Sequence, residues 1–225
     1  MFSKDTNLSV TCFIWTGLYL CQMTDPDNSS PPSAARRGPP KKGEPSARER
    51  ILATANELFY REGIRAIGID TVIAESGVSK ASLYRTFESK DALIAAFVAE
   101  RDRLFWIWWN KIAEKHAHEP RALLDAVLVG TAKRIAQADY RGCPFLNMAT
   151  EFPDTDHPGR VVARTNKDEL RSRLASICAR IGTPDANRAA GQLLLLINGA
   201  YATGQMAYDE ELSANLLDAA ARIVA

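Results

Sequence analysis

The sequence has few of the residues and spacings from which metal sites and enzyme active sites are built. It contains four cysteines and three histidines, and no two cysteines form a C-x-x-C pair or stand at a Cys/His metal spacing. His116 and His118 are two residues apart, which places them on different faces of a helix. A glycine-rich phosphate loop and a nucleophile elbow are both absent. We therefore expect no metal, no cofactor and no catalytic residue, in a protein of the reducing cytoplasm.

A run of apolar residues long enough to cross a membrane is also missing. The apolar segment from Val10 to Cys21 has polar flanks and is much shorter than the roughly 20 residues of a spanning helix. A weak signal-peptide core is one interpretation. We prefer another, in which translation starts at Met23 and residues 1–22 are an upstream extension. Residues 24–45 are rich in Pro and Ser, so we expect residues 1–45 to be a disordered arm, and no membrane to be a partner.

The chain has almost no excess of positive or negative charge overall, but the charges are unevenly distributed along it. The formal net charge is only +1. The segment from Arg36 to Lys90 nevertheless holds 11 Lys/Arg against 7 Asp/Glu, whereas residues 91–225 hold 16 against 17. A modest positive surplus in one segment favours contact with an anionic partner such as phosphate at that segment.

That basic segment ends in two short helical patterns joined by a tight turn. The apolar positions of the two patterns are Ile69, Val72, Ile73, Leu83 and Phe87. Gly77 can adopt the positive φ that ends the first helix, and Ser79 is a suitable N-cap for a second helix from Lys80 to Thr86. This arrangement predicts a helix-turn-helix, whose second helix would enter a DNA groove.

A longer amphipathic helix precedes the pair. Ser46-x-x-Glu49 has the form of a capping box, and Gly63 marks the end of the helix near Arg61. Its apolar stripe consists of Ile51, Leu52, Ala55, Leu58 and Phe59. We expect this helix to brace the other two.

Several short pieces of this region occur in the order typical of the TetR family of bacterial transcriptional regulators. They are Ile73-Ala74, Gly77-Val78-Ser79, Leu83-Tyr84, Phe87 and Ser89-Lys90 with Leu93. From about Arg48 to Leu93 the chain therefore resembles the DNA-binding module of that family. The resemblance implies an all-α fold of about nine helices, with a helix-turn-helix domain at residues 46–91 and a ligand-binding and dimerisation domain at residues 92–225.

The resemblance and the helical pattern together indicate which residues would contact DNA. Family positions that hold the sugar-phosphate backbone match Tyr84 and Lys90, and Arg48 would reach a phosphate from the first helix. Residues that face away from the apolar side of the second helix are candidates for reading base edges. The full predicted set is Arg48, Thr71, Ser79, Lys80, Ala81, Ser82, Tyr84, Arg85 and Lys90. The alternative is that some of them only solvate the helix. Gly68 stands where the family often has a Ser or Thr cap.

A long helix is predicted from Ser89 to about Ala117, because Pro120 is the first residue that breaks it. Four aromatic residues within five positions, Phe105 to Trp109, exceed what a two-layer core needs. Core packing is the plain interpretation, and the wall of an effector pocket is the alternative. The predicted ligand-binding residues are Phe105, Trp108, Trp109, Leu128, Phe145, Met148, Tyr201 and Gln205.

Cys143 precedes Pro144, which suits the first position of a short helix after the helix predicted at residues 121–138. A thiol at a helix N-terminus ionises more easily, so Cys143 is a candidate thiol sensor. An inert structural cysteine is the alternative interpretation.

The C-terminal part predicts a helix from about Arg160 to Ile181, a second that Thr183-Pro184-Asp185 caps and that reaches about Tyr208, and a third from about Glu211 to Val224. The middle helix contains Leu193 to Ile197, a segment that is apolar on every side and must be covered all round. A second copy of the chain would supply the missing cover. The resemblance implies the same homodimer, through residues of about 160–224.

The leading hypothesis is therefore a homodimeric repressor that binds a palindromic double-stranded DNA operator and is released by a small apolar or aromatic effector. Two alternatives remain open at this point. One is an effector-free architectural or scaffold protein on DNA, and the other is a redox sensor that acts through Cys143.

Overall fold

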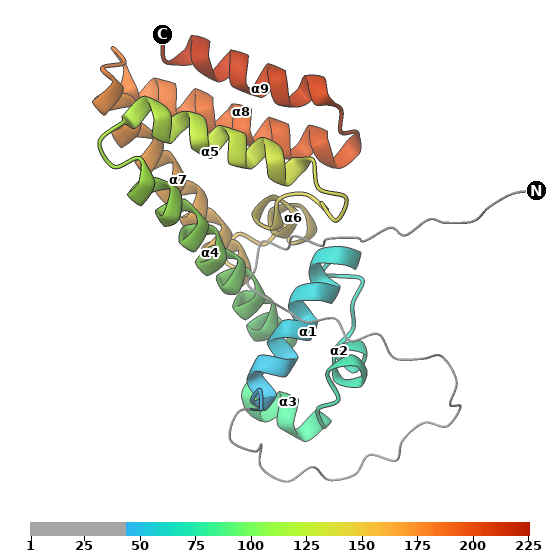
Figure 1. The fold of residues 1–225 in the computed structure, drawn as a ribbon. Coiled ribbons are helices and arrows are strands. Elements are labelled where there is room, and N and C mark those ends of the chain that lie inside the picture. Colours follow the sequence, from blue (N-terminus) through green and yellow to red (C-terminus); the bar gives the residue numbers. More distant parts are fainter. Residues whose placement is uncertain (1–43) are drawn as a thin grey trace, which may run out of the picture. The chain divides into compact units, whose positions relative to one another are not determined.

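The computed structural model describes residues 44–225, and within this range the chain forms nine α-helices and no strand (Figure 1). The helices are α1 (Ala47–Glu62), α2 (Ile69–Ser76), α3 (Lys80–Thr86), α4 (Lys90–Lys115), α5 (Pro120–Ile135), α6 (Pro144–Glu151), α7 (Pro158–Ile181), α8 (Ala186–Met206) and α9 (Glu210–Ile223). The all-α fold predicted from the sequence is confirmed. The predictions for residues 1–43, including the start at Met23, lie outside the described residues.

Side-chain caps begin three of the first four helices. In α1 the backbone N–H of Glu49 donates to Ser46 Oγ at 3.2 Å, and the backbone N–H of Ser46 donates to Glu49 Oε2 at 2.7 Å, which is the predicted capping box. Ser79 and Ser89 accept in the same way at the starts of α3 and α4. The start of α2 differs, because Gly68 offers no side chain and only Asp70 in the first turn complements the helix dipole.

Helices α1, α2 and α3 share one apolar core with the beginning of α4. Ile51, Ala55, Val72 and Leu83 have no exposed surface, and the rings of Phe59 and Phe97 meet edge to face at 5.6 Å between centroids. Each large apolar side chain buried in this way stabilises the fold by about 1.5–3 kcal/mol. Because Phe97 belongs to α4, the long helix is packed into the N-terminal helices and is more than a linker.

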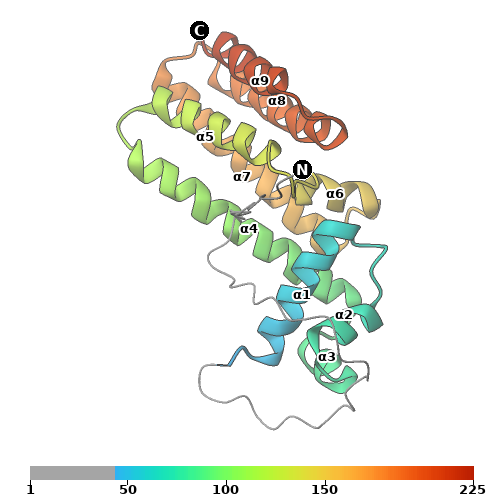
Figure 2. The ribbon, with the colours of Figure 1, turned by 45° about the vertical axis from the view of Figure 1, so that its right-hand side comes forward.

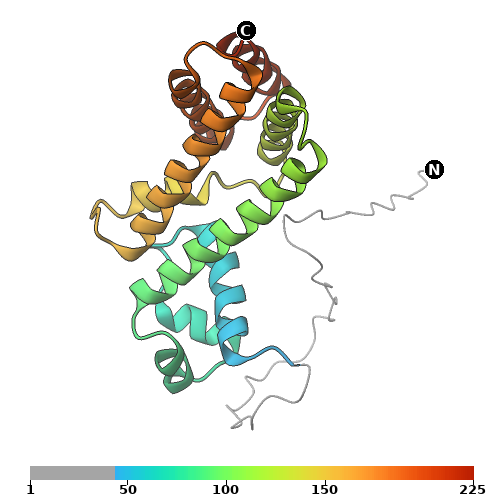
Figure 3. The same ribbon diagram turned by 90° about the vertical axis from the view of Figure 1, so that its left-hand side faces the viewer.

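The other end of α4 lies among the C-terminal helices. Figure 3 shows α4 running from beside α1 to the turn before α5, and Figure 2 shows α8 beside α9. Helix α7 packs on both α4 and α8 and so occupies the middle of this group. The side chains at its centre include Leu124, Leu128, Leu174, Leu193 and Ile197. No helix in the described part of the chain combines the length and the apolar character that a membrane span requires.

Several predicted helix ends need correction. The long helix ends at Lys115 and not at Ala117, and Pro120 is the first residue of α5, which ends at Ile135 and not at 138. Proline is tolerated in the first turn of a helix, where its missing N–H would have no partner. For the same reason α7 starts at Pro158, two residues before the predicted Arg160. Helix α8 ends at Met206 and not at Tyr208.

The turn between α2 and α3 gives a testable prediction. Gly77 has φ of 62°, and an added Cβ would meet nothing within 4 Å there or at Gly68. Gly77→Ala should therefore lower the free energy of unfolding by about 1–2 kcal/mol through backbone strain alone. Gly68→Ser, whose backbone already has an N-cap conformation with φ of −80°, should raise it by about 0.5 kcal/mol. Urea denaturation measures both, and equal effects of the two substitutions would contradict this account.

Candidate nucleic-acid interface

The orientation of α3 is set by its buried residues. Leu83 is fully buried and Phe87 nearly so, and both anchor α3 to the helices behind it. Tyr84 and Arg85 lie on the opposite side and are exposed to solvent. Of the nine residues predicted to contact DNA, seven are exposed, and Ser82 and Lys90 are half-buried. The structure thus leaves the predicted set accessible to a large ligand.

Two of the predicted residues also form the start of α3. Ser79 Oγ accepts the backbone N–H of Ser82 at 3.3 Å, so the hydroxyl hydrogen of Ser79 is available to an acceptor such as a phosphate oxygen. Arg85 Nη2 donates to Ser82 Oγ at 3.1 Å. This bond holds the Arg85 side chain along the helix, and Arg85 must leave Ser82 in order to reach a base.

Lys80 has a partner that the sequence pattern did not indicate. Its ammonium nitrogen lies 3.2 Å from Asp70 Oδ1 on α2, and the two side chains are 64% and 84% exposed. An ion pair with this exposure contributes about 0–1 kcal/mol. Asp70 therefore restrains Lys80 only weakly, but it places a negative charge beside the face that would meet phosphates.

Arg48 joins the same surface from the first turn of α1. Its guanidinium lies 5.4 Å from the centroid of the Phe87 ring, at the end of α3. Thr71 is exposed on α2, and Lys90 is the first residue of α4, directly after the cap Ser89. A helix N-terminus attracts anions because its N–H groups lack partners. Residues from α1, α2 and α4 thus surround α3.

The residues predicted to bind an effector fall into two groups. Phe105, Trp108 and Trp109 of α4 cluster, and the ring of Phe105 also meets Phe145 of α6 edge to face at 6.2 Å between centroids. Met148 and Leu128 are buried near the same core. Trp108 packs so closely on α5 that a Cβ at Gly130 would lie 2.6 Å from its ring. These contacts are those of a packed core.

The second group consists of Tyr201 and Gln205, which both belong to α8. Tyr201 is buried, and burial raises its pKa. Gln205 is exposed, and its side chain covers Gly142, where an added Cβ would lie 2.3 Å from Gln205 Oε1. A cleft of about 560 Å³ lies elsewhere, between the start of α5 and the end of α7, and its lining includes Arg121 and Arg180. None of the eight predicted residues lines that cleft.

Lys167 of α7 is a residue that the sequence interpretation missed. Its ammonium nitrogen donates to Asn198 Oδ1 at 2.8 Å and to Cys143 Sγ at 3.6 Å, and it lies over the rings of Phe145 and Tyr201. No spacing in the polar sequence of α7 distinguishes it. Cys143 is the N-cap of α6, as predicted, and is only 5% exposed. Its role as a thiol sensor stays a prediction.

Metal-binding clusters of three or more His, Cys, Asp or Glu do not occur among residues 44–225. His157 Nε2 lies 3.4 Å from Asp91 Oδ1, and its Nδ1 accepts the N–H of Gly159 at the start of α7. This histidine acts as the cap of a helix.

Comparison with known proteins agrees with this geometry. Residues 51–97 match the family model described as bacterial regulatory proteins, tetR family. The HTH-type transcriptional regulator YxaF of Bacillus subtilis is 28% identical over 121 residues, which are 52% of this chain and 61% of that protein. The match thus spans about three fifths of the length of this relative.

Solved structures are similar over longer segments. SCO4454, a TetR-family transcriptional regulator from Streptomyces coelicolor, has 31% sequence identity and a TM-score of 0.75, covering 79% of this chain and 94% of that one. A TetR-type regulator from Streptomyces avermitilis, sav143, has 33% identity and a TM-score of 0.66, covering 79% and 99%.

The pair formed by Lys80 and Asp70 leads to a prediction about duplex DNA. Asp70→Asn removes a negative charge from the exposed face and frees Lys80, so binding should tighten by about three- to tenfold at low salt. Fluorescence anisotropy with a labelled duplex measures this, and the gain should shrink as salt increases. Asp218→Asn on α9, which also breaks an exposed ion pair, is the matched control. An affinity that Asp70→Asn leaves unchanged at every salt concentration would show that this face does not meet phosphates.

Proposed function

The chain belongs to the TetR family of bacterial transcriptional regulators, and from that premise we propose that it is a homodimeric repressor released from a palindromic operator by a small effector. As a member of this family it is a DNA-binding transcription factor and not an enzyme. The observation that carries the proposal is the exposed face of α3, with Tyr84 and Arg85 outward and Leu83 buried behind them. Its place of action is the cytoplasm, where the chromosome lies.

Recognition of the operator follows from the roles assigned to this face. Tyr84, Lys90, Arg48 and the hydroxyl of Thr71 would hold phosphates, which fixes the register of α3 in the major groove. Lys80 or Arg85 would donate to a guanine, while the small side chain of Ala81 leaves room for a thymine methyl group. Residues 46–91 act as the DNA-binding domain, and residues 92–225 serve for dimerisation and effector binding.

The second copy of the chain would dock on α8. Two apolar side chains of this helix are highly exposed, Leu195 at 73% and Met206 at 80%. Gly191, Gly199 and Ala202 continue the same face, and a Cβ at either glycine would meet nothing within 4 Å. Such a stripe of apolar and small residues supports close packing against a symmetry-related copy. A twofold dimer then presents two α3 helices to successive major grooves, about 34–36 Å apart in B-DNA.

Release by an effector would use α4. The aromatic cluster of Phe105, Trp108, Trp109 and Phe145 packs around the middle of this helix, whereas its start directly follows α3. A small aromatic molecule that inserts there must displace α4, because the cluster is closely packed. Displacement would change the separation of the two recognition helices. An effector-free architectural protein is the alternative, and operator affinity that no metabolite changes would favour it.

Removal of the exposed face of α3 tests the function directly. A duplex selected from a random pool by the full-length protein serves as the operator. The double substitution Tyr84→Ala with Arg85→Ala should weaken its binding by roughly 10- to 1,000-fold, because a phosphate contact and a base contact are lost together. Electrophoretic mobility shifts at fixed salt measure the change. Arg171→Ala, which removes an exposed charge from α7, should have little effect. An unchanged affinity of the double variant would rule the proposal out.

The homodimer gives a separate prediction. Because the interface is twofold symmetric, Leu195→Glu places two negative charges in it, one from each copy. Self-association should weaken by roughly 100-fold or more. Analytical ultracentrifugation at micromolar concentration measures this. Ile107→Glu, at another exposed apolar residue on α4, is the matched control and should leave the dimer intact. A dimer unaffected by Leu195→Glu, or a wild-type protein that remains a single subunit, would contradict the assignment.

A further inference from the structure

Tyr60, near the end of α1, makes all of its hydroxyl hydrogen bonds to the C-terminal part of the chain. The hydroxyl accepts from Arg134 Nη2 of α5 at 2.9 Å and from the backbone N–H of Arg141 at 3.1 Å, and it donates to the carbonyl oxygen of Gly142 at 3.1 Å. A phenolic hydroxyl has one hydrogen to donate and two lone pairs to accept, so its capacity is filled. A side chain of α1 thus ends among groups of α5 and of the loop between α5 and α6.

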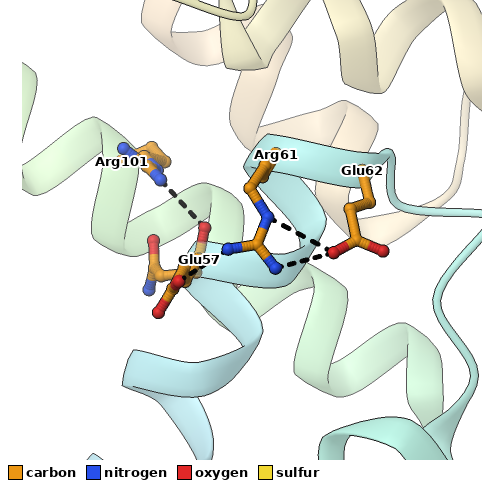
Figure 4. Close-up of polar contacts among 5 residues, drawn as sticks. Glu57, Arg61, Glu62 and Arg101 are labelled. Atoms are coloured by element: carbon orange, nitrogen blue, oxygen red, sulfur yellow. Dashed lines mark hydrogen bonds and ion pairs between the residues drawn. The ribbon is translucent and has the colours of Figure 1, made fainter. Parts of the chain in front are cut away.

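The ring of Tyr60 is also in contact with two arginine side chains. The guanidinium of Arg101 lies 4.4 Å from the ring centroid and that of Arg134 lies 5.6 Å from it, which are both cation–π distances. Arg101 Nη2 also donates to the carbonyl oxygen of Asn56 in α1 at 2.9 Å (Figure 4). Burial lowers the pKa of Arg101 to about 10, which still leaves it protonated at neutral pH. The cation–π contact of Arg101 with the Tyr60 ring therefore persists at neutral pH.

Arg134 is oriented independently of Tyr60. Its guanidinium is buried, and Nη1 binds Asp139 Oδ1 at 2.8 Å and the side chain of Gln137. A buried guanidinium with these partners has one orientation, because any other would leave its charge without compensation. Arg134 therefore fixes the hydroxyl of Tyr60 relative to α5 and to the loop that follows it.

The neighbouring contacts repeat the connection at both ends of α6. Before α6, Arg141 Nε donates to the carbonyl oxygen of Arg61 at 2.9 Å, while the guanidinium of Arg61 itself faces Glu57 and Glu62 on its own helix (Figure 4). At the other end of α6, the backbone N–H of Arg65 donates to Glu151 Oε2 at 2.7 Å. The end of α1 thus contacts the residues before α6, and the turn after α1 contacts the last residue of α6.

We propose that Tyr60 and Arg134 form a positioning pair that sets the angle of α1–α3 against the C-terminal helices, and hence the spacing of the two recognition helices. The proposal rests on the proposed homodimeric function. Neither residue belongs to the exposed face that meets DNA. Their effect on binding is therefore expected only where two half-sites must be engaged together.

The test compares a complete operator with a single half-site. Tyr60→Phe keeps the ring and both cation–π contacts but removes three hydrogen bonds. Affinity for the palindromic duplex selected by the wild-type protein should fall about tenfold or more, within the usual range of coupling between sites. Affinity for the same duplex with one half-site scrambled should change less than about twofold. A substitution that only destabilised the fold would lower both affinities together.

Two further variants sharpen the result. Arg134→Lys keeps the charge but loses the planar guanidinium. The double variant Tyr60→Phe with Arg134→Lys should bind the complete operator no more weakly than the single variant that has the lower affinity. Tyr140→Phe removes one hydroxyl hydrogen bond, to the carbonyl of Tyr201 within the C-terminal helices, and is the matched control. It should leave the ratio of the two affinities at the wild-type value.

Two outcomes overturn the inference. If the wild-type protein selects a palindrome but Tyr60→Phe lowers neither affinity, or lowers both by the same factor, the positioning role is wrong and the proposed function stands. If the wild-type protein selects no duplex with two half-sites, the proposed function fails, and the positioning role fails with it.

Discussion

Leu83 and Phe87 are buried in the core that α1, α2 and α3 share with the beginning of α4, and this burial decides which side of α3 remains in water. Helix α3 has only seven residues, too few to be stable alone. Two buried anchors at about 1.5–3 kcal/mol each, together with the Ser79 cap, hold it in place. The exposed side of α3, which we propose enters a DNA groove, is a consequence of this packing.

Helix α4 extends the same constraint to the rest of the molecule. At its start, Phe97 shares the core of α1, and further along, Phe105 shares a core with Phe145 of α6. A rigid helix packed at both ends cannot shift at one end without disturbing the other. The polar contacts of Tyr60 add a second connection, through α5 and the loop before α6. The DNA-binding helices and the C-terminal helices are therefore joined by an apolar and a polar route.

The local features of the fold were predictable from the sequence because they depend on neighbouring residues. Each of these features depends on residues a few positions apart. The capping box of Ser46 and Glu49, the positive φ of Gly77 and the N-cap Ser79 all have the predicted role in the structure. The errors lie at helix ends. The sequence pattern indicates Pro120 as a breaker and a helix start at about Arg160, two residues after Pro158, although each proline begins a helix. Proline suits both places, and only the surrounding packing decides between them.

The sequence by itself determined the helical pattern and the position of the helix-turn-helix, because periodicity and capping are short-range properties. Only the tertiary structure decided which side chains meet across the fold. Lys80 with Asp70, Lys167 with Cys143 and Tyr60 with Arg134 are separated by ten or more residues, and no spacing marks them as partners. The relative placement of helices creates such pairs, and that placement results from the burial of the whole core.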